Sequence, residues 1–144
     1  MRSPEDTRKH QSLIHELVEI FEREGYQISE ADEEKGFARP VELHNDGYGD
    51  QLDKAPDIRA YDPKTGQYIL GEAKTGLDDL ETEHALTQYN VFLDQTDNRT
   101  GKKFRLYIIL PSLKLPEFNT LITHYIHRDY WENIVLVNSV RWTE

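Results

Sequence analysis

The sequence predicts a single α/β domain in which helices flank a central mixed β-sheet. The chain has 144 residues, of which 37% are apolar, and this is enough for one hydrophobic core but not for two domains. Helical and strand-like patterns alternate along the chain. The continuous apolar run Leu106–Leu110 is typical of a strand that helices cover on both faces. We therefore expect residues 1–144 to form one domain.

The first predicted element is a helix from roughly Glu5 to Glu24. Its apolar residues have the i, i+3, i+4, i+7 spacing of an amphipathic helix, and Gly25 is typical of a helix end. These apolar residues are Ile14, Leu17, Val18 and Phe21. A short strand over Tyr26–Ile28 could follow. The acidic run Ser29–Lys35 predicts a solvated turn or loop.

Two strand-like runs, Pro56–Tyr61 and Gln67–Thr75, predict a β-hairpin. The segment between them contains a proline, which fixes one turn position, and a glycine, which permits a left-handed one. If the loop consists of the four residues Pro63–Gly66, then Asp62 pairs with Gln67 across the hairpin.

The rest of the chain alternates between helix and strand. The predicted elements are a helix from Asp79 to roughly Asp97, a strand over Lys103–Leu110, a helix from Pro116 to about Arg128, and a strand over Ile134–Val137. The order helix, strands, helix, strand, helix, strand indicates an α/β sandwich with a mixed sheet.

The hairpin brings together residues that could carry chemistry. With a four-residue loop Asp57 lies opposite Glu72, and Lys74 shares their face because strand side chains alternate. With a three-residue loop the register shifts by one, and Asp57 faces Gly71 instead. Opposed carboxylates repel, and a divalent cation or a neighbouring positive charge relieves that repulsion. The alternative is a solvated ion pair between Lys74 and one carboxylate on an exposed sheet face.

Magnesium is the cation that we expect at this site, with manganese as a substitute. Mg²⁺ prefers oxygen ligands and keeps several waters, so two carboxylates and substrate phosphate oxygens would suit it. Such an ion can polarise a phosphodiester and lower the pKa of a water molecule, while a lysine stabilises charge in the transition state. The implied chemistry is phosphodiester hydrolysis.

The segment Pro56-Asp57, followed after 14 residues by Glu72-Ala73-Lys74, resembles the signature of the PD-(D/E)XK nuclease superfamily. That group includes restriction endonucleases, Holliday junction resolvases and recombination nucleases. The resemblance implies a restriction-endonuclease-like sandwich. It also implies metal ligation by the carboxylates of Asp57 and Glu72 and by the carbonyl of Ala73, with Lys74 as the catalytic lysine.

Two further features of the family are matched less closely. Some members carry a glutamine on the helix after the lysine strand, often followed by a tyrosine, and Gln88 is our candidate for that supporting role. Some members also carry a glutamate on the first helix. Three glutamates compete for that position, all are expected to point away from the apolar stripe, and none is assigned; they are Glu16, Glu19 and Glu22.

The net charge of −10 argues against a nonspecific nucleic-acid coat protein, which needs a basic surface. The charge is uneven: residues 1–53 have 6 basic and 14 acidic side chains, a net of −8, and residues 54–144 have 11 and 13, a net of −2. A basic cluster without acids could hold a DNA backbone, although a solvated loop is the alternative. It consists of Arg99, Lys102, Lys103 and Arg105.

We expect a magnesium-dependent DNA endonuclease that recognises DNA structure or acts with a partner subunit, and RNA stays an alternative substrate. A homodimer is expected because cutting two strands takes two sites. The alternatives are a catalytically silent nuclease-fold accessory protein that binds DNA or protein partners, and an acidic protein-interaction module. The chain has no cysteine, no apolar run of membrane-spanning length and no signal-peptide pattern, so a cytoplasmic location without membrane contact is expected.

Overall fold

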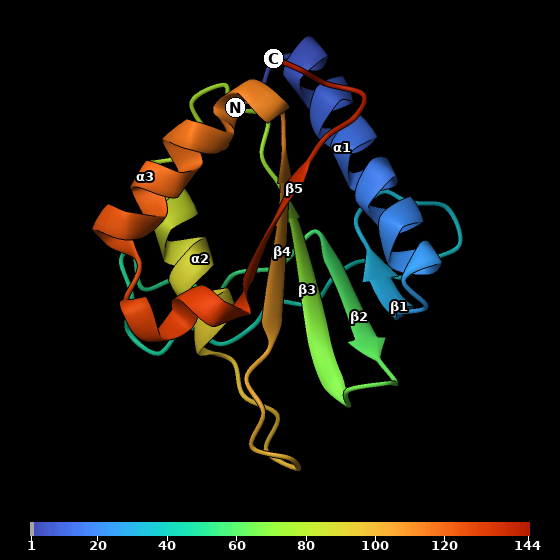
Figure 1. Ribbon diagram of the computed structural model, residues 1–144, viewed down its shortest axis with the longest axis vertical. Coiled ribbons are helices and arrows are strands. Elements are labelled where there is room, and N and C mark those ends of the chain that lie inside the picture. The colour runs from blue at the N-terminus through green and yellow to red at the C-terminus, as the bar shows by residue number, and fades with distance from the viewer. Residues whose placement is uncertain (1) are drawn as a thin grey trace.

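The computed structural model describes residues 2–144 and has the predicted architecture, a single α/β domain with a five-strand mixed sheet packed against helices (Figure 1). The helices are α1 (Pro4–Arg23), α2 (Glu83–Asp94) and α3 (Leu115–Tyr125). The strands are β1 (Gln27–Ala31), β2 (Ile58–Asp62), β3 (Gln67–Ala73), β4 (Arg105–Leu110) and β5 (Ile134–Asn138). Two short 3₁₀ helices are η1 (Ser112–Lys114) and η2 (Arg128–Asn133). Over residues 2–144 no helix is long and apolar enough to cross a membrane.

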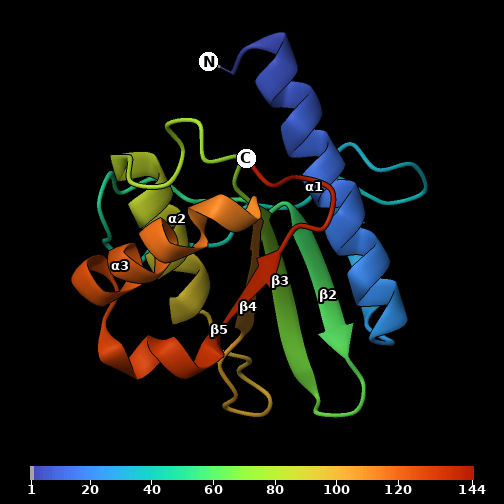
Figure 2. The same cartoon turned by 45° about the horizontal axis from the view of Figure 1, so that its top comes forward.

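The strands follow one another across the sheet in chain order, β1-β2-β3-β4-β5. The pairs β1–β2 and β2–β3 are antiparallel, whereas β3–β4 and β4–β5 are parallel. Helix α1 covers one face of the sheet, and α2 and α3 cover the other (Figure 1). The parallel strands β3, β4 and β5 therefore end on the same side of the domain, where α1 also begins. Figure 2 turns this side toward the viewer.

The register of the β2–β3 hairpin is the predicted one. Asp62 pairs with Gln67 and Ile58 pairs with Gly71, so the loop has four residues. The Asp62 side chain holds this loop, because it accepts hydrogen bonds from the backbone N–H of Lys64 at 2.9 Å and from the hydroxyl of Thr65 at 3.0 Å. This register places the residue before β2, Asp57, beside the last residues of β3.

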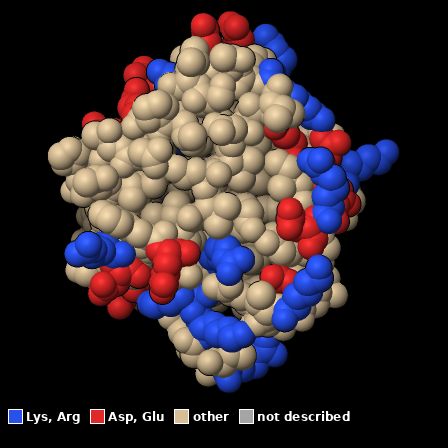
Figure 3. Space-filling model, in the orientation of Figure 1, with Lys and Arg blue, Asp and Glu red and all other residues tan. Residues whose placement is uncertain are grey.

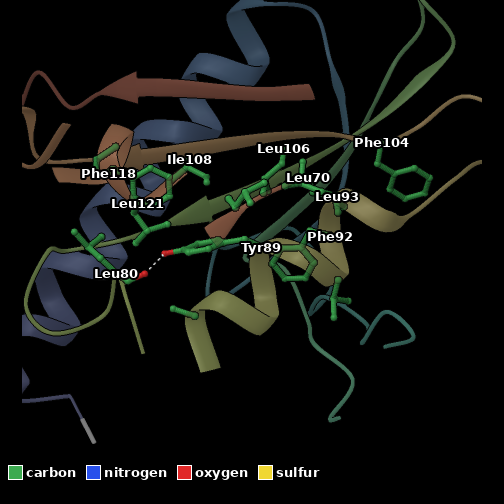
Figure 4. Close-up of a cluster of buried hydrophobic side chains, with 14 of the residues drawn as sticks. Leu70, Leu80, Tyr89, Phe92, Leu93, Phe104, Leu106, Ile108, Phe118 and Leu121 are labelled. Atoms are coloured by element: carbon green, nitrogen blue, oxygen red, sulfur yellow. Dashed lines mark hydrogen bonds between the residues drawn. The ribbon is translucent and has the colours of Figure 1, made fainter. Parts of the chain in front are cut away.

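The sheet separates two hydrophobic clusters. On one face the apolar stripe of α1 packs on inward-facing strand residues that include Ile58, Ala60, Ile69 and Ala73. On the other face α2 and α3 pack on β3 and β4 through Leu70, Leu106 and Ile108 (Figure 4). Tyr89 lies in this second cluster, and its hydroxyl donates to the carbonyl of Leu80 at 2.8 Å. Both helical layers are thus fixed against the hairpin strand β3.

Several predicted boundaries differ from those of the structure, and three of the differences have a clear physical reason or consequence. The acidic run is not all loop, because β1 extends to the buried Ala31, which pairs with Ile58. Helix α2 starts at Glu83 instead of Asp79, because the Asp79 carboxylate binds the backbone of the preceding turn. The third helix ends at Tyr125, and the separate helix η2 follows it.

Gly71 sets how closely α1 approaches β3. A Cβ atom at this position would lie 2.9 Å from Cδ2 of Leu17, 3.1 Å from Cβ of Ile58 and 3.2 Å from Cζ of Phe21. These distances are shorter than ordinary van der Waals contacts, so a side chain here would push α1 away from the sheet.

We predict that Gly71→Ala lowers the free energy of unfolding by about 1–3 kcal/mol, the usual cost of overpacking a core. Urea denaturation of the variant beside the natural protein measures this cost. Leu17→Val removes the nearest Cδ atom, so the double variant should lose less stability than the two single variants added together. Additive losses would show that Gly71 and Leu17 do not compete for the same space.

Candidate functional site

Two carboxylates meet where β3 ends. The backbone N–H of Asp57 donates to Oε1 of Glu72 at 3.1 Å, and the backbone N–H of Ala73 donates to Oδ2 of Asp57 at 2.8 Å. Glu72 is 2% exposed, because it points from β3 toward the α2 side of the sheet. Each carboxylate is therefore held by the backbone next to the other one.

Lys74 and Gln88 complete this group. Nζ of Lys74 lies 3.3 Å from Oε2 of Glu72 and donates to Oε1 of Gln88 at 2.6 Å. It also lies 5.5 Å from the centre of the Tyr89 ring. Lys74 is 3% exposed, so its ammonium is fixed between β3 and α2. The sequence-predicted residues Asp57, Glu72, Lys74 and Gln88 thus come together.

The two carboxylates have opposite pKa shifts. Burial raises the pKa of Glu72 well above its ordinary value, and the adjacent charge of Asp57 raises it further, against the opposing effect of Lys74. Burial also acts to raise the pKa of Asp57, but the hydrogen bond and charge of His10 and the Ala73 N–H lower it overall. These surroundings therefore favour the negative charge on Asp57 and oppose a negative charge on Glu72.

Helix α1 contributes residues that the sequence analysis missed. Nε2 of His10 lies 3.3 Å from Oδ2 of Asp57, and the buried Asp6 lies one turn earlier and binds Arg2 at 2.9 Å. Asp6 and His10 are four residues apart and continue the α1 stripe that includes Ile14 and Leu17. Asp6 and His10 are polar residues at helix positions that the periodicity turns toward the sheet, and this mismatch was the signal that could have revealed them.

The turn after β3 forms another wall of the site. Asp79 accepts hydrogen bonds from the backbone N–H groups of Thr75 at 2.7 Å and Gly76 at 2.8 Å, and Nη1 of Arg2 lies 3.3 Å from it. Gly76 has a φ of +83° and packs against the side chain of Lys114. The turn is thus fixed both to the start of α1 and to η1.

His84, at the start of α2, also faces the site. Its Nδ1 lies 2.8 Å from Nζ of Lys54, which in turn lies 2.7 Å from Oδ2 of Asp50. Burial lowers the pKa of His84, and the nearby charges of Lys54 and Lys74 lower it further. These surroundings therefore disfavour a positive charge on the imidazole.

These groups surround a pocket of about 630 Å³, which we call the carboxylate pocket. Five acidic side chains line it, together with Arg2, Lys74, His10, His84 and Gln88; the acids are Asp6, Asp57, Glu72, Asp78 and Asp79. The pocket is large enough for a phosphate group with its water shell.

Asp57 and Glu72 are side chains of this pocket that could contribute oxygen ligands to a magnesium ion. The carboxylates of Asp57 and Glu72 lie side by side, and within residues 2–144 the buried Oδ1 of Asp6 has no hydrogen-bond donor. In the same range no three His, Asp or Glu side chains lie close enough together to hold a metal ion. Asp57 and Glu72 would therefore be the protein's side-chain ligands, and water would supply most of the other positions, as Mg²⁺ tolerates.

The other predicted residues lie away from this pocket. The expectation that all three α1 glutamates avoid the core was wrong for Glu16, which is buried and accepts hydrogen bonds from the hydroxyl of Ser139 at 2.7 Å and the N–H of Val140 at 2.8 Å. Glu19 interacts with Arg141. Glu16 and Glu19 thus fix the end of the described chain, and neither they nor Glu22 line the carboxylate pocket.

The basic cluster Arg99, Lys102, Lys103 and Arg105 lies at the opposite end of the sheet. The carbonyl of Lys103 accepts from the side chain of Gln67, the first residue of β3, whereas Glu72 is near its end. Five residues at about 3.3 Å each give a separation of roughly 17 Å. Figure 1 shows the corresponding loop before β4 at the bottom of the molecule. This cluster therefore lies well outside the carboxylate pocket.

Comparison of the chain with models of known protein families, with curated proteins and with solved structures gave no match. A function has to be inferred from the chemistry of the site itself.

We predict that Glu72→Gln stabilises the metal-free protein at neutral pH. Because the pKa of Glu72 is raised in the folded state, the folded protein keeps a proton that the unfolded chain releases above about pH 4.5. The free energy of unfolding therefore falls as the pH rises through this range, and glutamine removes that loss. Thermal unfolding with a chelator present, from pH 4 to pH 8, should show the advantage of the variant growing with pH.

The matched control is Glu81→Gln, which removes an exposed glutamate. Its unfolding curve should follow that of the natural protein at each pH. If Glu72→Gln also follows the natural protein, Glu72 is ionised in the folded state at neutral pH.

Proposed function

We propose that this protein is a magnesium-dependent DNA endonuclease. The observation that carries the proposal is the convergence of Asp57, Glu72 and Lys74, with Gln88 bound to the lysine, in one pocket. An ordinary solvated ion pair would leave these side chains exposed, yet Glu72 and Lys74 are both buried. Burying the ammonium of Lys74 costs free energy, and a catalytic role would account for a lysine at this position.

Each residue has a separate role in the proposed reaction. Asp57 and Glu72 would hold the ion, which supplies a water of lowered pKa and a polarised phosphodiester. Lys74 would donate to phosphate oxygens as negative charge builds up on them. Gln88 orients the Lys74 ammonium, and His10 orients Asp57.

The arrangement of the sheet also supports the endonuclease proposal. An antiparallel hairpin that carries both carboxylates, with a parallel strand beside it and helices on both faces, is the arrangement expected of a restriction-endonuclease-like sandwich. We therefore include this fold family in the proposal, with Ala73 offering its carbonyl as a further ligand.

Cleavage assays test this proposal. With magnesium or manganese, the protein should cut supercoiled plasmid or a branched DNA junction, and Asp57→Ala, Glu72→Gln and Lys74→Ala should each lose at least about 100-fold in rate, the usual scale for electrostatic catalytic groups. Lys64→Ala, at an exposed position in the β2–β3 turn, should retain full activity.

Circular dichroism establishes that each variant is folded. The contrary outcome is that the natural protein binds the metal at Asp57 and Glu72 and yet cuts neither DNA substrate nor a branched RNA junction. In that case the endonuclease proposal is wrong, and an accessory, non-catalytic role takes its place.

The partner that we propose besides DNA is a second copy of the chain. Strand β5 is an edge of the sheet, and its residues Ile134–Val137 are aliphatic and half-buried. Figure 3 shows a broad area without charged side chains on the face that β5 and α3 present. Strand edges in natural proteins usually carry charges that prevent pairing. Two β5 edges could pair in an antiparallel, self-complementary way, which would supply a second active site.

We predict that light scattering gives twice the mass of one chain and that Val135→Lys reduces it to the mass of one chain. The reason is that a lysine on β5 places a charge beside the edge that would pair. Because Val135 also packs against the cluster under α1, circular dichroism must first show that the variant is folded. Val41→Lys, at a position that is 61% exposed in another part of the fold, should stay dimeric. A natural protein that is monomeric at all concentrations would contradict the dimer.

A further inference from the structure

A second pocket of about 670 Å³ lies next to the carboxylate pocket. Leu77 lines both pockets, and Lys74 of the first is followed in the chain by Thr75 of the second. Neighbouring residues of α1 line different pockets: His10 lines the first and Lys9 lines the second. The two pockets therefore flank the same turn and the same helix.

The second pocket has the opposite balance of charge. Its charged lining consists of three basic side chains, Lys9, Lys114 and Arg141, and two acidic ones, Glu5 and Glu144. Arg141 is already engaged by Glu19. Lys9 and Lys114 are thus the cations that remain for a ligand.

Lys9 is the decisive residue, because no anion pairs with its ammonium among residues 2–144 and its side chain lines the second pocket. It is 8% exposed, and within residues 2–144 its Nζ has neither a hydrogen-bond acceptor nor a carboxylate in range. Its only close partner there is the Trp142 ring, whose centre lies 5.4 Å away. An ammonium that lines a cavity and has no paired carboxylate is available to bind an anion there.

The position of Lys114 supports this interpretation. Its aliphatic stem packs against Gly76, since a Cβ atom on that glycine would lie 2.6 Å from Cγ of Lys114. Its Nζ lies 4.0 Å from Oε1 of Glu117, the limit of an ion pair. The lysine is thus fixed to the same turn that borders the catalytic residues.

We propose that Lys9, Lys114 and Trp142 form a subsite for a phosphate of the nucleic-acid strand, next to the phosphate that is cut. This inference rests on the proposed endonuclease function. A strand that leaves the carboxylate pocket past Leu77 would bring its neighbouring phosphate to the two lysines. The indole of Trp142 offers an aromatic surface to the attached nucleotide.

The first experiment uses inorganic phosphate as the probe, with Lys9→Met as the variant and Lys64→Met as the matched control. Both substitutions remove one positive charge, and methionine fits the space of a buried lysine stem. At constant ionic strength, phosphate should raise the thermal unfolding midpoint of the natural protein and of Lys64→Met but not that of Lys9→Met. This experiment does not depend on whether the protein cuts DNA.

The second experiment measures DNA binding and DNA cleavage. Binding of an oligonucleotide in Ca²⁺ should weaken by about tenfold in Lys9→Met, and the slope of log K against log salt should fall by about 0.7–0.9, the value for one lost phosphate contact. In Mg²⁺ the loss in kcat/KM should come mainly from KM. An oligonucleotide with and without a terminal phosphate distinguishes an end phosphate from an internal one.

If Lys9→Met and Lys64→Met behave alike in both experiments, the subsite is wrong, whether or not the protein is a nuclease. If the protein cuts no DNA but phosphate still stabilises it through Lys9, the endonuclease proposal fails and the anion site stands, for a free phosphate or nucleotide. Should Lys9→Met fail to fold, Lys114→Gln takes the same two tests, with the same outcomes expected.

Discussion

The pairing of β2 with β3 in one register is the constraint on which the site depends. It aligns Asp57 with the end of β3, so that the N–H groups of Asp57 and Ala73 each stabilise the carboxylate from the opposite strand. A shift by one residue would turn Glu72 and Lys74 toward α1 and expose Gly71 to α2. Gly71 prevents that shift, since only a residue without a side chain fits beneath Leu17 and Phe21. The packing of α1 and the geometry of the site are therefore two results of the same register.

Helix α1 links the hydrophobic core to the chemistry. From Leu13 to Phe21 the face of α1 that packs on the sheet is apolar. The first turns of the helix place Asp6 and His10 in the same pocket as Asp57. Because the helix is rigid, the position of His10 follows from the packing of Leu17, which lies two turns further along the same face. The same rigidity places Lys9, the neighbour of His10, in the second pocket.

The sequence predicted the hairpin and its three chemical residues because these depend on local rules. The turn chemistry of Asp62–Gly66 sets the loop length, and the two-residue period of a strand sets the shared face of Glu72 and Lys74. His10, Asp6 and the unaccompanied Lys9 were missed because their roles depend on how α1 lies on the sheet. That relation is between segments distant in the chain, and helical periodicity gives only the face that points inward. The late start of α2 was missed for a related reason, since Asp79 could either start a helix or bind the turn before it.

Five of the acids that contribute to the net charge of −10 line the carboxylate pocket. A protein that imitates DNA would need its carboxylates on the surface, where a partner could meet them. Here Glu72 is buried, Asp57 is bound by His10 and backbone, and Asp6 lies beneath Arg2, so these charges face a pocket. The overall charge would slow the approach of a polyanion, but the groups that a strand would meet past Leu77 are lysines. Affinity for nucleic acid would therefore come from a few local phosphate contacts, and its salt dependence would reflect the number of those contacts. A basic surface would instead attract nucleic acid over a broad area.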